Sequence, residues 1–353
     1  MDGGLFITLY DEKTLALYLK YGTYGFLMKP VLEKQPSSRS MHYAALADYA
    51  CARRGTHVFF FLKRKIVYAG TVEGNQDIAS FYLNGDTSPL GRSAESELFW
   101  DESKRYVSTE RAGIFDVNGQ QKAQPYILLF SSVEDLTAKE VLSDDLYFEL
   151  GKYPFPLPSN TIQGMSFCTL TPGETEVALS LLRVSKRRFK FDSKEHMEIE
   201  GDKTLFQSNL LEYGNYINEA HLEFTLLADI KPFQRFLEEG SYILCRQVPI
   251  SPFKPFQMDR ADICMYNTDK PICNGTIPNI IIELKKERAN FHAYNQMVRY
   301  LRWLEKITNE EEFARITPII IAPSFFVNRS KADLTYEGRI IMYTLGGTIY
   351  SLL

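Results

Sequence analysis

The sequence predicts an α+β N-terminal domain built from short strands, followed by an α/β C-terminal domain with a mixed central sheet. The chain has 353 residues, and single hydrophobic cores stop growing at roughly 250–300 residues. Short aromatic runs separated by turn residues fill the first half, whereas helical and strand patterns alternate in the second. We therefore expect domains at residues 1–184 and 208–353, joined by a charged linker at 185–207.

Composition narrows the class of protein. The formal net charge is −4, so a nucleic-acid site would have to be a local patch rather than the whole surface. The five cysteines are scattered and lack Cys-x-x-Cys spacing, which favours free thiols and a reducing cytoplasm over disulfides or zinc. The sequence shows no P-loop motif, and its apolar runs are of strand length. We therefore expect no nucleotide hydrolysis, no signal peptide and no membrane contact.

The first half contains short strand patterns with two helices between them. Helices are expected at 11–20 and 41–52, with a polar loop at 33–40 before the second. Continuous apolar runs indicate strands that are buried on both faces or closed into a barrel. A small β-barrel or sandwich is therefore expected. The expected strands are 5–10, 24–28, 58–62, 66–72, 81–83, 113–115 and 126–130.

One segment of the first half resembles a known superfamily. A helix is followed by Arg-Arg-Gly-Thr-His at 53–57, Val-Phe-Phe-Phe at 58–61, a turn, and Ile-Val-Tyr-Ala-Gly at 66–70. This order resembles the PUA-like superfamily, which includes the EVE and YTH domains. The resemblance implies a small barrel that binds nucleic acid, often by flipping a modified base into an aromatic pocket. Arg39 in the loop 37–40, together with Phe99 and Trp100, would form that pocket; a solvated loop and a core aromatic pair are the plainer interpretation.

Basic side chains in the first half are further candidates for contact with phosphate. Lys63, Arg64 and Lys65 lie at the expected hairpin tip between two strands. Arg187 and Arg188 lie near the start of the expected linker. A charged hairpin tip and a solvated linker explain the same residues without any ligand, so both interpretations stay open.

The second half reads as helix, three strands, helix and strand, with a closing hairpin. Asn218 is expected to cap a helix that begins at Glu219. A turn-rich insert at 267–278 joins two of the strands, which predicts an antiparallel hairpin. The last strands are expected to form an edge hairpin that turns at Gly346 and Gly347. The expected strands are 242–250, 261–266, 279–285, 317–322, 339–345 and 348–352, with an amphipathic helix at 290–306.

Two carboxylates and an amine are expected to converge on this hairpin. Asp262 lies near the start of one strand and Glu283 near the end of its partner, so hairpin pairing makes them cross-strand neighbours. Lys285 lies two positions after Glu283 and projects from the same face. Mg²⁺ typically binds one or two carboxylates and keeps waters and phosphate oxygens as further ligands. The spacing therefore predicts a Mg²⁺ site that hydrolyses a phosphodiester, with Lys285 orienting the attacking water.

Other polar residues around the hairpin are candidates for secondary roles. Glu219, or Glu223 one turn later, would complete the metal's ligands, although a solvated glutamate explains either, and is favoured for Glu223. Gln296 would position the substrate backbone or a water, or would make a structural hydrogen bond. His221 and His292 flank the site and are expected to be surface histidines. Basic residues suited to steering DNA are Lys286, Arg288, Arg299 and Arg302.

The order of these motifs resembles the PD-(D/E)xK nuclease superfamily, and within it the NucS-like (EndoMS) branch. The matching pieces are Glu-Ala-His-Leu at 219–222, Arg-Ala-Asp-Ile at 260–263, Glu-Leu-Lys at 283–285 and a helix containing Gln296. The approach to Asp262 lacks the usual glycine, and the insert lengthens the hairpin. The resemblance covers about residues 218–323 and implies a restriction-endonuclease-like fold.

The resemblance implies a Mg²⁺-dependent DNA endonuclease, with Mn²⁺ able to substitute, that serves restriction of foreign DNA or DNA repair. The N-terminal domain would select the target, and cutting of both strands would favour a homodimer. Two other classes stay open at this stage: a nucleic-acid-binding protein that uses a nuclease-like scaffold without catalysis, and a nuclease that cleaves RNA.

Overall fold

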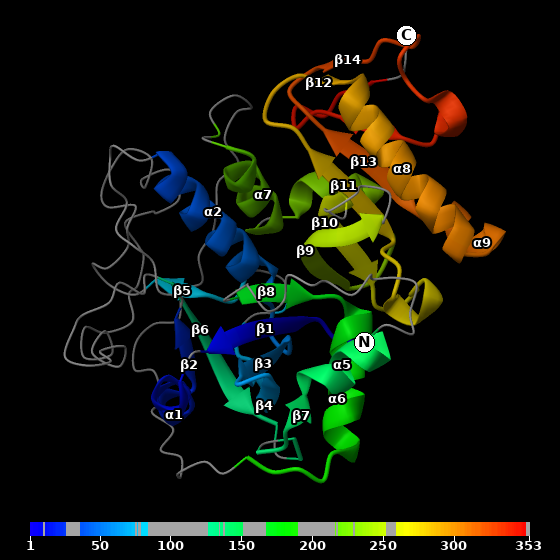
Figure 1. Cartoon of the computed structure of the whole chain (residues 1–353). Helices are drawn as coiled ribbons and strands as arrows, with labels where there is room; N and C mark the ends of the chain where they lie inside the picture. Colours follow the sequence, from blue (N-terminus) through cyan, green and yellow to red (C-terminus); the bar gives the residue numbers. More distant parts are fainter. Residues whose placement is uncertain are drawn as a thin grey trace.

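The N-terminal half is organised around a curled, half-barrel sheet whose order is β2-β6-β4-β3-β1-β8 (Figure 1). Strand β5 also pairs with β6, and β7 pairs with β4. Its strands are β1 (Gly4–Leu9), β2 (Thr23–Gly25), β3 (His57–Leu62), β4 (Lys65–Val72), β5 (Tyr82–Leu83), β6 (Tyr126–Ser132), β7 (Val141–Leu142) and β8 (Phe167–Leu170). The structure, a computed structural model, describes residues 1–9, 11–25, 36–74, 76, 79–83, 126–133, 135–136, 138–150, 167–189, 216, 218–228, 230–251 and 259–350.

Strands β3 and β4 form the hairpin that the apolar runs predicted. Val58, Phe59 and Phe60 are fully buried in succession, which is what a strand covered on both faces requires. The turn places Lys63 and Arg64 at φ of 50° and 62°, the left-handed conformation that matches the twist of a two-residue hairpin. Strand β1 pairs in parallel with β3, so α1 (Glu12–Tyr21), β2 and α2 (Pro36–Cys51) form the crossover between them.

Helix α2 corrects one prediction. Residues 37–40 were expected in a polar loop, but the helix already begins at Pro36. Proline is favoured in the first helical turn because its missing N–H would have no partner there. Leu46, Tyr49 and Ala50 form part of the buried face of α2. The remaining helices of this half are α5 (Ser143–Leu150) and α6 (Pro172–Val184).

The C-terminal half is a mixed sheet in the order β16-β15-β13-β11-β10-β9. Strands β11, β13 and β15 run parallel to one another, while β9, β10 and β16 pair antiparallel to their neighbours. The predicted edge hairpin is confirmed by the pairing of β15 with β16. The strands of this sheet are β9 (Tyr242–Ser251), β10 (Asp259–Asn267), β11 (Ile280–Leu284), β13 (Thr317–Ile321), β15 (Ile341–Tyr343) and β16 (Ile349–Tyr350).

Helices cover both faces of this second sheet. Helix α8 (Phe291–Ile307) is capped at its N-terminus by Asn290, whose side chain accepts a hydrogen bond from His292 N. Its buried face, including Met297 and Leu301, packs with Cys264 and Ile281 on one side of the sheet. Helix α7 (Glu219–Ala228) covers the other side. Shorter elements are η4 (Lys231–Phe236), η5 (Cys273–Gly275), α9 (Glu310–Ala314), η6 (Leu334–Tyr336) and the pair β12 (Ala289–Asn290) and β14 (Phe325–Phe326).

Helices α2 and α7 lie side by side and join the two halves (Figure 1). The rings of Tyr43 and His221 stack with centroids 4.2 Å apart. The guanidinium of Arg53 donates a hydrogen bond of 2.9 Å to the carbonyl of Leu227. One continuous hydrophobic cluster therefore contains residues from both sheets.

The beginning of the predicted linker belongs to the N-terminal fold. The Ser185 hydroxyl donates to the carbonyl of Glu140 over 2.7 Å, and Phe189 N donates to the carbonyl of Ala138 over 2.7 Å. Residues 190–207 lie outside the described residues, so the domain boundary stays a prediction. The five cysteines carry free thiols, as expected. Within the described ranges, no helix combines the length and apolar character needed to cross a membrane.

Candidate active site

The β10–β11 hairpin places Asp262 directly opposite Glu283. Ile263 pairs with Ile282 in the antiparallel register, and the next pair of residues along the ladder is Asp262 and Glu283. The insert between the strands is held by Asn279, whose side-chain oxygen accepts a hydrogen bond of 2.8 Å from Asn267 N. The predicted hairpin is confirmed, and its register places Asp262 across from Glu283.

The Asp262 carboxylate is held at both oxygens. Oδ2 accepts a hydrogen bond of 2.7 Å from Leu284 N on the partner strand. Oδ1 accepts a hydrogen bond of 3.0 Å from the side-chain amide of Gln247 on β9. Burial, followed by the nearby Glu223 carboxylate, raises the pKa of Asp262 to about 7. Ionisation of this carboxyl therefore carries a cost that a nearby cation would offset.

The Glu283 carboxylate is buried, with 2% of its side chain exposed. Oε1 accepts a hydrogen bond of 2.7 Å from Lys285 Nζ. Oε2 lies 3.0 Å from the Tyr300 hydroxyl, which donates from helix α8. Burial, followed by repulsion from Asp262, raises the pKa of Glu283 to about 8. The two carboxyls thus share one electrostatic environment.

Lys285 lies beside both carboxylates, immediately after β11. Burial alone would lower the pKa of its ammonium, but Glu283 and Asp262 outweigh burial and raise that pKa. Its Nζ also lies 4.0 Å from Oε1 of Glu219, at the N-terminal end of α7. The Glu219 side chain is 52% exposed. The structure therefore brings together Asp262, Glu283 and Lys285, with Glu219 at the open side of the group.

Gln296 reaches the site through another residue. Its side-chain amide donates a hydrogen bond of 2.6 Å to the hydroxyl of Tyr300, one helical turn later. The same hydroxyl lies 2.6 Å from the carbonyl of Arg260. Of the two roles that the sequence left open for Gln296, the structure shows the structural hydrogen bond. Tyr300 is the residue that contacts Glu283, and its i+4 spacing from Gln296 is the signal that could have identified it.

Two predictions about helix α7 are wrong. His221 was expected at the surface but is 1% exposed, and burial lowers its pKa to about 3. Glu223 was expected to be solvated but is also buried, with its carboxylate 2.7 Å from a guanidinium nitrogen of Arg246. Both corrections have the same physical cause: α2 covers α7, which a sequence pattern within α7 does not reveal. His292 is exposed, as expected.

Four of the basic candidates in the N-terminal half, Lys63, Arg64, Lys65 and Arg187, are paired with acids. Lys63 Nζ lies 2.8 Å from Glu12, and Arg64 lies 2.8 Å from Asp144. Lys65 Nζ lies 3.0 Å from Glu140. Arg187 lies 3.9 Å from Asp145, and Arg188 forms a backbone bridge with Lys139. The side chain of Arg39 and the residues Phe99 and Trp100 lie outside what the structure describes.

The basic candidates in the C-terminal half differ in their surroundings. Arg299 Nε lies 2.7 Å from the buried carboxylate of Asp259, so this guanidinium is tied to the protein. Arg288 is exposed, and its guanidinium lies 4.6 Å from the centre of the Phe326 ring. Lys286 is half-buried in the same loop, just after Lys285. The loop that follows β11 therefore carries two of the basic candidates, Lys286 and Arg288, within five residues of Glu283.

The chemistry of the donor set fits a hard divalent cation. Asp262 and Glu283 supply four carboxylate oxygens on adjacent strands, and each carboxyl has a raised pKa. A cation beside them would relieve both the burial cost and the mutual repulsion. Among the described residues, no three His, Cys, Asp or Glu side chains form a complete metal-binding group. Mg²⁺ needs only one or two carboxylates when water and phosphate supply its other ligands.

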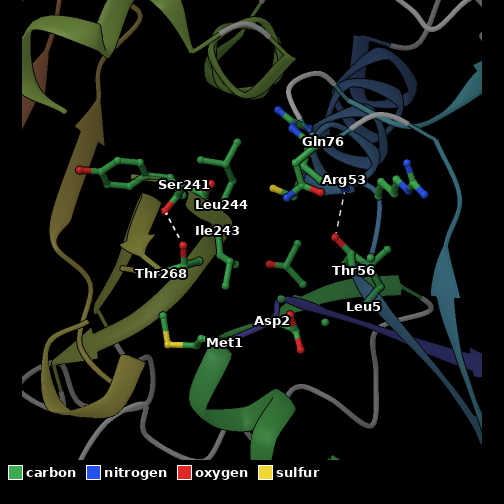
Figure 2. A pocket seen from close by; sticks show the side chains of 17 residues that line it. Met1, Asp2, Leu5, Arg53, Thr56, Gln76, Ser241, Ile243, Leu244 and Thr268 are labelled. Carbon is green, nitrogen blue, oxygen red and sulfur yellow. Dashed lines mark hydrogen bonds between the residues drawn. The ribbon is translucent and has the colours of Figure 1, made fainter. Parts of the chain in front are cut away.

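A separate cavity of about 240 Å³ lies between the two halves, away from the carboxylates (Figure 2). It is lined by the N-terminal residues Met1 and Asp2, by Arg53 and Thr56, and by Ser241 and Thr268 of the C-terminal half. Thr268 donates a hydrogen bond of 3.1 Å to the carbonyl of Ser241 at its wall. None of the predicted catalytic residues lines it.

Neither a protein-family model nor a curated protein matches the chain. The YTH domain of a Zygosaccharomyces rouxii protein, in complex with N6-methyladenosine RNA, overlaps 53% of this chain and 90% of its own at 9% identity, with a TM-score of 0.28. A repair endonuclease from Pyrococcus abyssi overlaps 31% of this chain and 40% of its own at 25% identity, with a TM-score of 0.21. The structure of an EndoMS complex with double-stranded DNA overlaps 39% and 46% at 20% identity, with a TM-score of 0.23.

Two of the three structures carry names that the sequence resemblances also gave, YTH and EndoMS. The chain covers less than half the length of either endonuclease. TM-scores of this size do not establish a shared fold, so the geometry of Asp262, Glu283 and Lys285 has to carry any functional conclusion.

Proposed function

We propose that the protein is a Mg²⁺-dependent endonuclease that hydrolyses phosphodiester bonds in DNA. The observation that carries the proposal is the convergence of Asp262, Glu283 and Lys285 at adjacent strands. Asp262 lies opposite Glu283 in the hairpin, and Lys285 Nζ lies 2.7 Å from Glu283. Carboxylates that point apart would have favoured a scaffold without catalysis.

Each residue has a distinct role in the proposal. Asp262 and Glu283 hold Mg²⁺, and Glu219, the acid at the open side of the group, assists them. When bound, Mg²⁺ stabilises charge on the phosphoryl oxygens and lowers the pKa of a bound water. Lys285 orients the attacking water and offsets the negative charge that develops on the phosphate. Tyr300 and Gln296 hold Glu283 in place from α8, so the carboxylate does not have to reorient during the reaction.

The N-terminal half would select the DNA. We propose a PUA-like recognition domain that inspects a modified or flipped base, attached to a restriction-endonuclease-like domain that cuts. The curled sheet and its direct packing through α2 onto α7 support a recognition domain placed next to the catalytic one. The proposed setting is restriction of foreign DNA or a repair incision, and a homodimer would supply the second active site for a double-strand cut.

The test is cleavage of modified and unmodified plasmid DNA with Mg²⁺ and with a chelator in its place. Asp262→Asn and Lys285→Ala are expected to reduce the cleavage rate by roughly 100-fold or more. Asp269→Asn and Lys270→Ala are matched controls, because both side chains are exposed at the opposite end of the same hairpin. These controls should cleave like the wild type.

Three outcomes would redirect the proposal. Full Mg²⁺-dependent cleavage by both Asp262→Asn and Lys285→Ala would exclude this site as the catalytic centre. DNA binding without cleavage by the wild type would favour a non-catalytic binding protein. Cleavage of RNA but not DNA in a parallel assay would change the substrate while keeping the catalytic residues.

A further inference from the structure

A continuous chain of side chains connects helix α2 of the N-terminal half to Asp262. Asp48 on α2 lies 3.1 Å from Arg246 Nη1 on β9. The same guanidinium donates to both oxygens of Glu223 on α7, over 3.0 and 2.7 Å. The amide of Gln247 lies 3.4 Å from Glu223 Oε1 and 3.0 Å from Asp262 Oδ1. A chain of contacts through α2, α7 and β9 therefore ends at one oxygen of the proposed metal ligand, where Gln247 makes the contact.

The ion-pair triad in this chain is buried. The exposed fractions of the Arg246, Asp48 and Glu223 side chains are 8%, 9% and 4%. Taking charges out of water is costly, and the guanidinium between the two carboxylates compensates the charge of both. Arg246 is further fixed by its backbone N–H, which donates a hydrogen bond of 3.2 Å to the Thr169 hydroxyl. Movement of α2 relative to β9 would therefore disturb Glu223 as well as Asp48.

Gln247 has an unusual backbone conformation for a strand residue. Its φ is 51° in the middle of β9, a left-handed value that residues other than glycine rarely adopt. The neighbouring register pairs Ala261 with Val248 and Ile263 with Arg246, which places Gln247 opposite Asp262. Strained residues persist where surrounding contacts over-determine them, and they concentrate at functional sites. Here the side-chain amide makes both contacts that link the triad to Asp262.

We propose that Gln247 is a positioning residue for Asp262, and that α2 controls this position through Asp48, Arg246 and Glu223. The inference rests on the proposed function only in taking Asp262 as a Mg²⁺ ligand. The N-terminal half would then do more than select DNA, because any shift of α2 would alter the affinity of the catalytic site for its metal.

The first test is Mg²⁺ binding by Gln247→Gly, measured by calorimetry on the full chain without DNA. Glycine suits the positive φ, so this variant removes the amide while relieving the backbone. Mg²⁺ affinity is expected to fall by roughly 10-fold or more, while thermal stability in the absence of Mg²⁺ stays equal or rises. If Gln247 had only a structural role, its replacement would lower thermal stability and leave Mg²⁺ affinity unchanged. Wild-type Mg²⁺ affinity in Gln247→Gly would overturn the positioning role.

The second test uses Asp48→Asn, which changes a residue of α2 that makes no contact with the carboxylates of the site. Mg²⁺ affinity is expected to fall by roughly 3-fold or more. Arg53→Lys is the matched control, because Arg53 also bridges the halves, through Leu227, but lies outside the chain of contacts. It should leave Mg²⁺ affinity unchanged.

The proposal that α2 influences the metal site would be overturned if Asp48→Asn bound Mg²⁺ as tightly as the wild type. An equal loss of affinity in Arg53→Lys would overturn it as well. A wild-type protein that binds no Mg²⁺ at all would instead contradict the proposed function, so the two failures are distinguishable.

Discussion

The hydroxyl of Tyr300 lies 3.0 Å from Oε2 of Glu283. The Tyr300 hydroxyl oxygen also lies 2.6 Å from the carbonyl of Arg260 and accepts a hydrogen bond of 2.6 Å from the Gln296 amide. One hydroxyl group therefore connects helix α8 to both strands of the hairpin that carries the carboxylates. Tyr300 therefore holds one oxygen of Glu283, while Lys285 holds the other.

Replacement of Tyr300 by Phe is expected to lower Mg²⁺ affinity or the cleavage rate by about 10- to 100-fold, since groups that orient metal ligands typically have effects of this size. Tyr294→Phe is a control on the same helix, because the buried Tyr294 hydroxyl has no hydrogen-bond partner among the described residues. Kinetics at several Mg²⁺ concentrations would measure the difference. Equal behaviour of the two variants would contradict the role of Tyr300.

Mg²⁺ binding is expected to release protons near neutral pH. In the metal-free protein the pKa of Asp262 is raised to about 7 and that of Glu283 to about 8. Both carboxyls must be deprotonated to bind metal, so Mg²⁺ affinity should rise from pH 6 to pH 9. Calorimetry at pH 7 in buffers with different ionisation enthalpies would measure the released protons. An affinity that does not change with pH would contradict this linkage.

The same shifts predict that metal-free protein loses stability as pH rises. In the folded protein both pKa values lie above the ordinary values of 3.8 and 4.5. At pH values between the ordinary and the raised pKa, the folded protein therefore binds more protons than the unfolded chain. The stabilising contribution is complete below about pH 4 and is lost as the pH rises through 7 and 8. Asp262→Asn should weaken this dependence, as measured by urea unfolding at pH 5.5 and 8.5.

Arg299 is expected to contribute to the stability of the fold through its ion pair with Asp259, rather than to DNA binding. Its guanidinium lies 2.7 Å from Asp259, whose side chain is 1% exposed. Arg299→Ala would leave that carboxylate buried without this partner, at a cost of about 1–3 kcal/mol in the free energy of unfolding. Arg302→Ala removes a more exposed ion pair with Asp333 and should cost about 1 kcal/mol or less. Denaturant unfolding of both variants would measure the difference, and equal losses would contradict it.

Arg288 is expected to contact DNA phosphate, whereas Lys63 is not. Arg288 is exposed, three residues after Lys285 in the chain, and its guanidinium lies over the Phe326 ring. The ammonium of Lys63 is instead paired with Glu12. Arg288→Ala should weaken DNA binding and reduce the salt dependence of affinity by about one phosphate contact. Lys63→Ala should change neither. Fluorescence anisotropy over a series of salt concentrations measures DNA affinity for both variants. If Lys63→Ala weakened DNA binding and Arg288→Ala did not, the N-terminal hairpin tip would be the part that contacts the DNA.

The catalytic hairpin was predictable because its information is local. The polar insert at 267–278 joins two apolar runs, and antiparallel pairing then brings Asp262 and Glu283 together. The two-residue spacing between Glu283 and Lys285 places both side chains on one face. The parallel arrangement of β11 and β13 follows equally directly from the helix between them.

The surroundings of the hairpin were not predictable, because they depend on contacts between distant segments. Arg246 and Asp48 are 198 positions apart in the chain, and nothing in the local strand pattern marks Arg246 or Gln247 as special. His221 and Glu223 look like surface residues within α7 until α2 covers them. The early start of α2 was missed because Ser and Pro are common in loops as well as in the first turn of a helix.

The position of the hairpin within its sheet determines how the site fails on heating. Strand β11 lies between β10 and β13, and β10 lies between β11 and β9, so neither carboxylate sits on an edge strand. Central strands open only in the largest unfolding events, and their amide hydrogens exchange with solvent most slowly. Glu219, at the exposed first turn of α7, has no such protection. Fraying would therefore remove the assisting acid first, while the carboxylate pair stays assembled until the whole sheet melts.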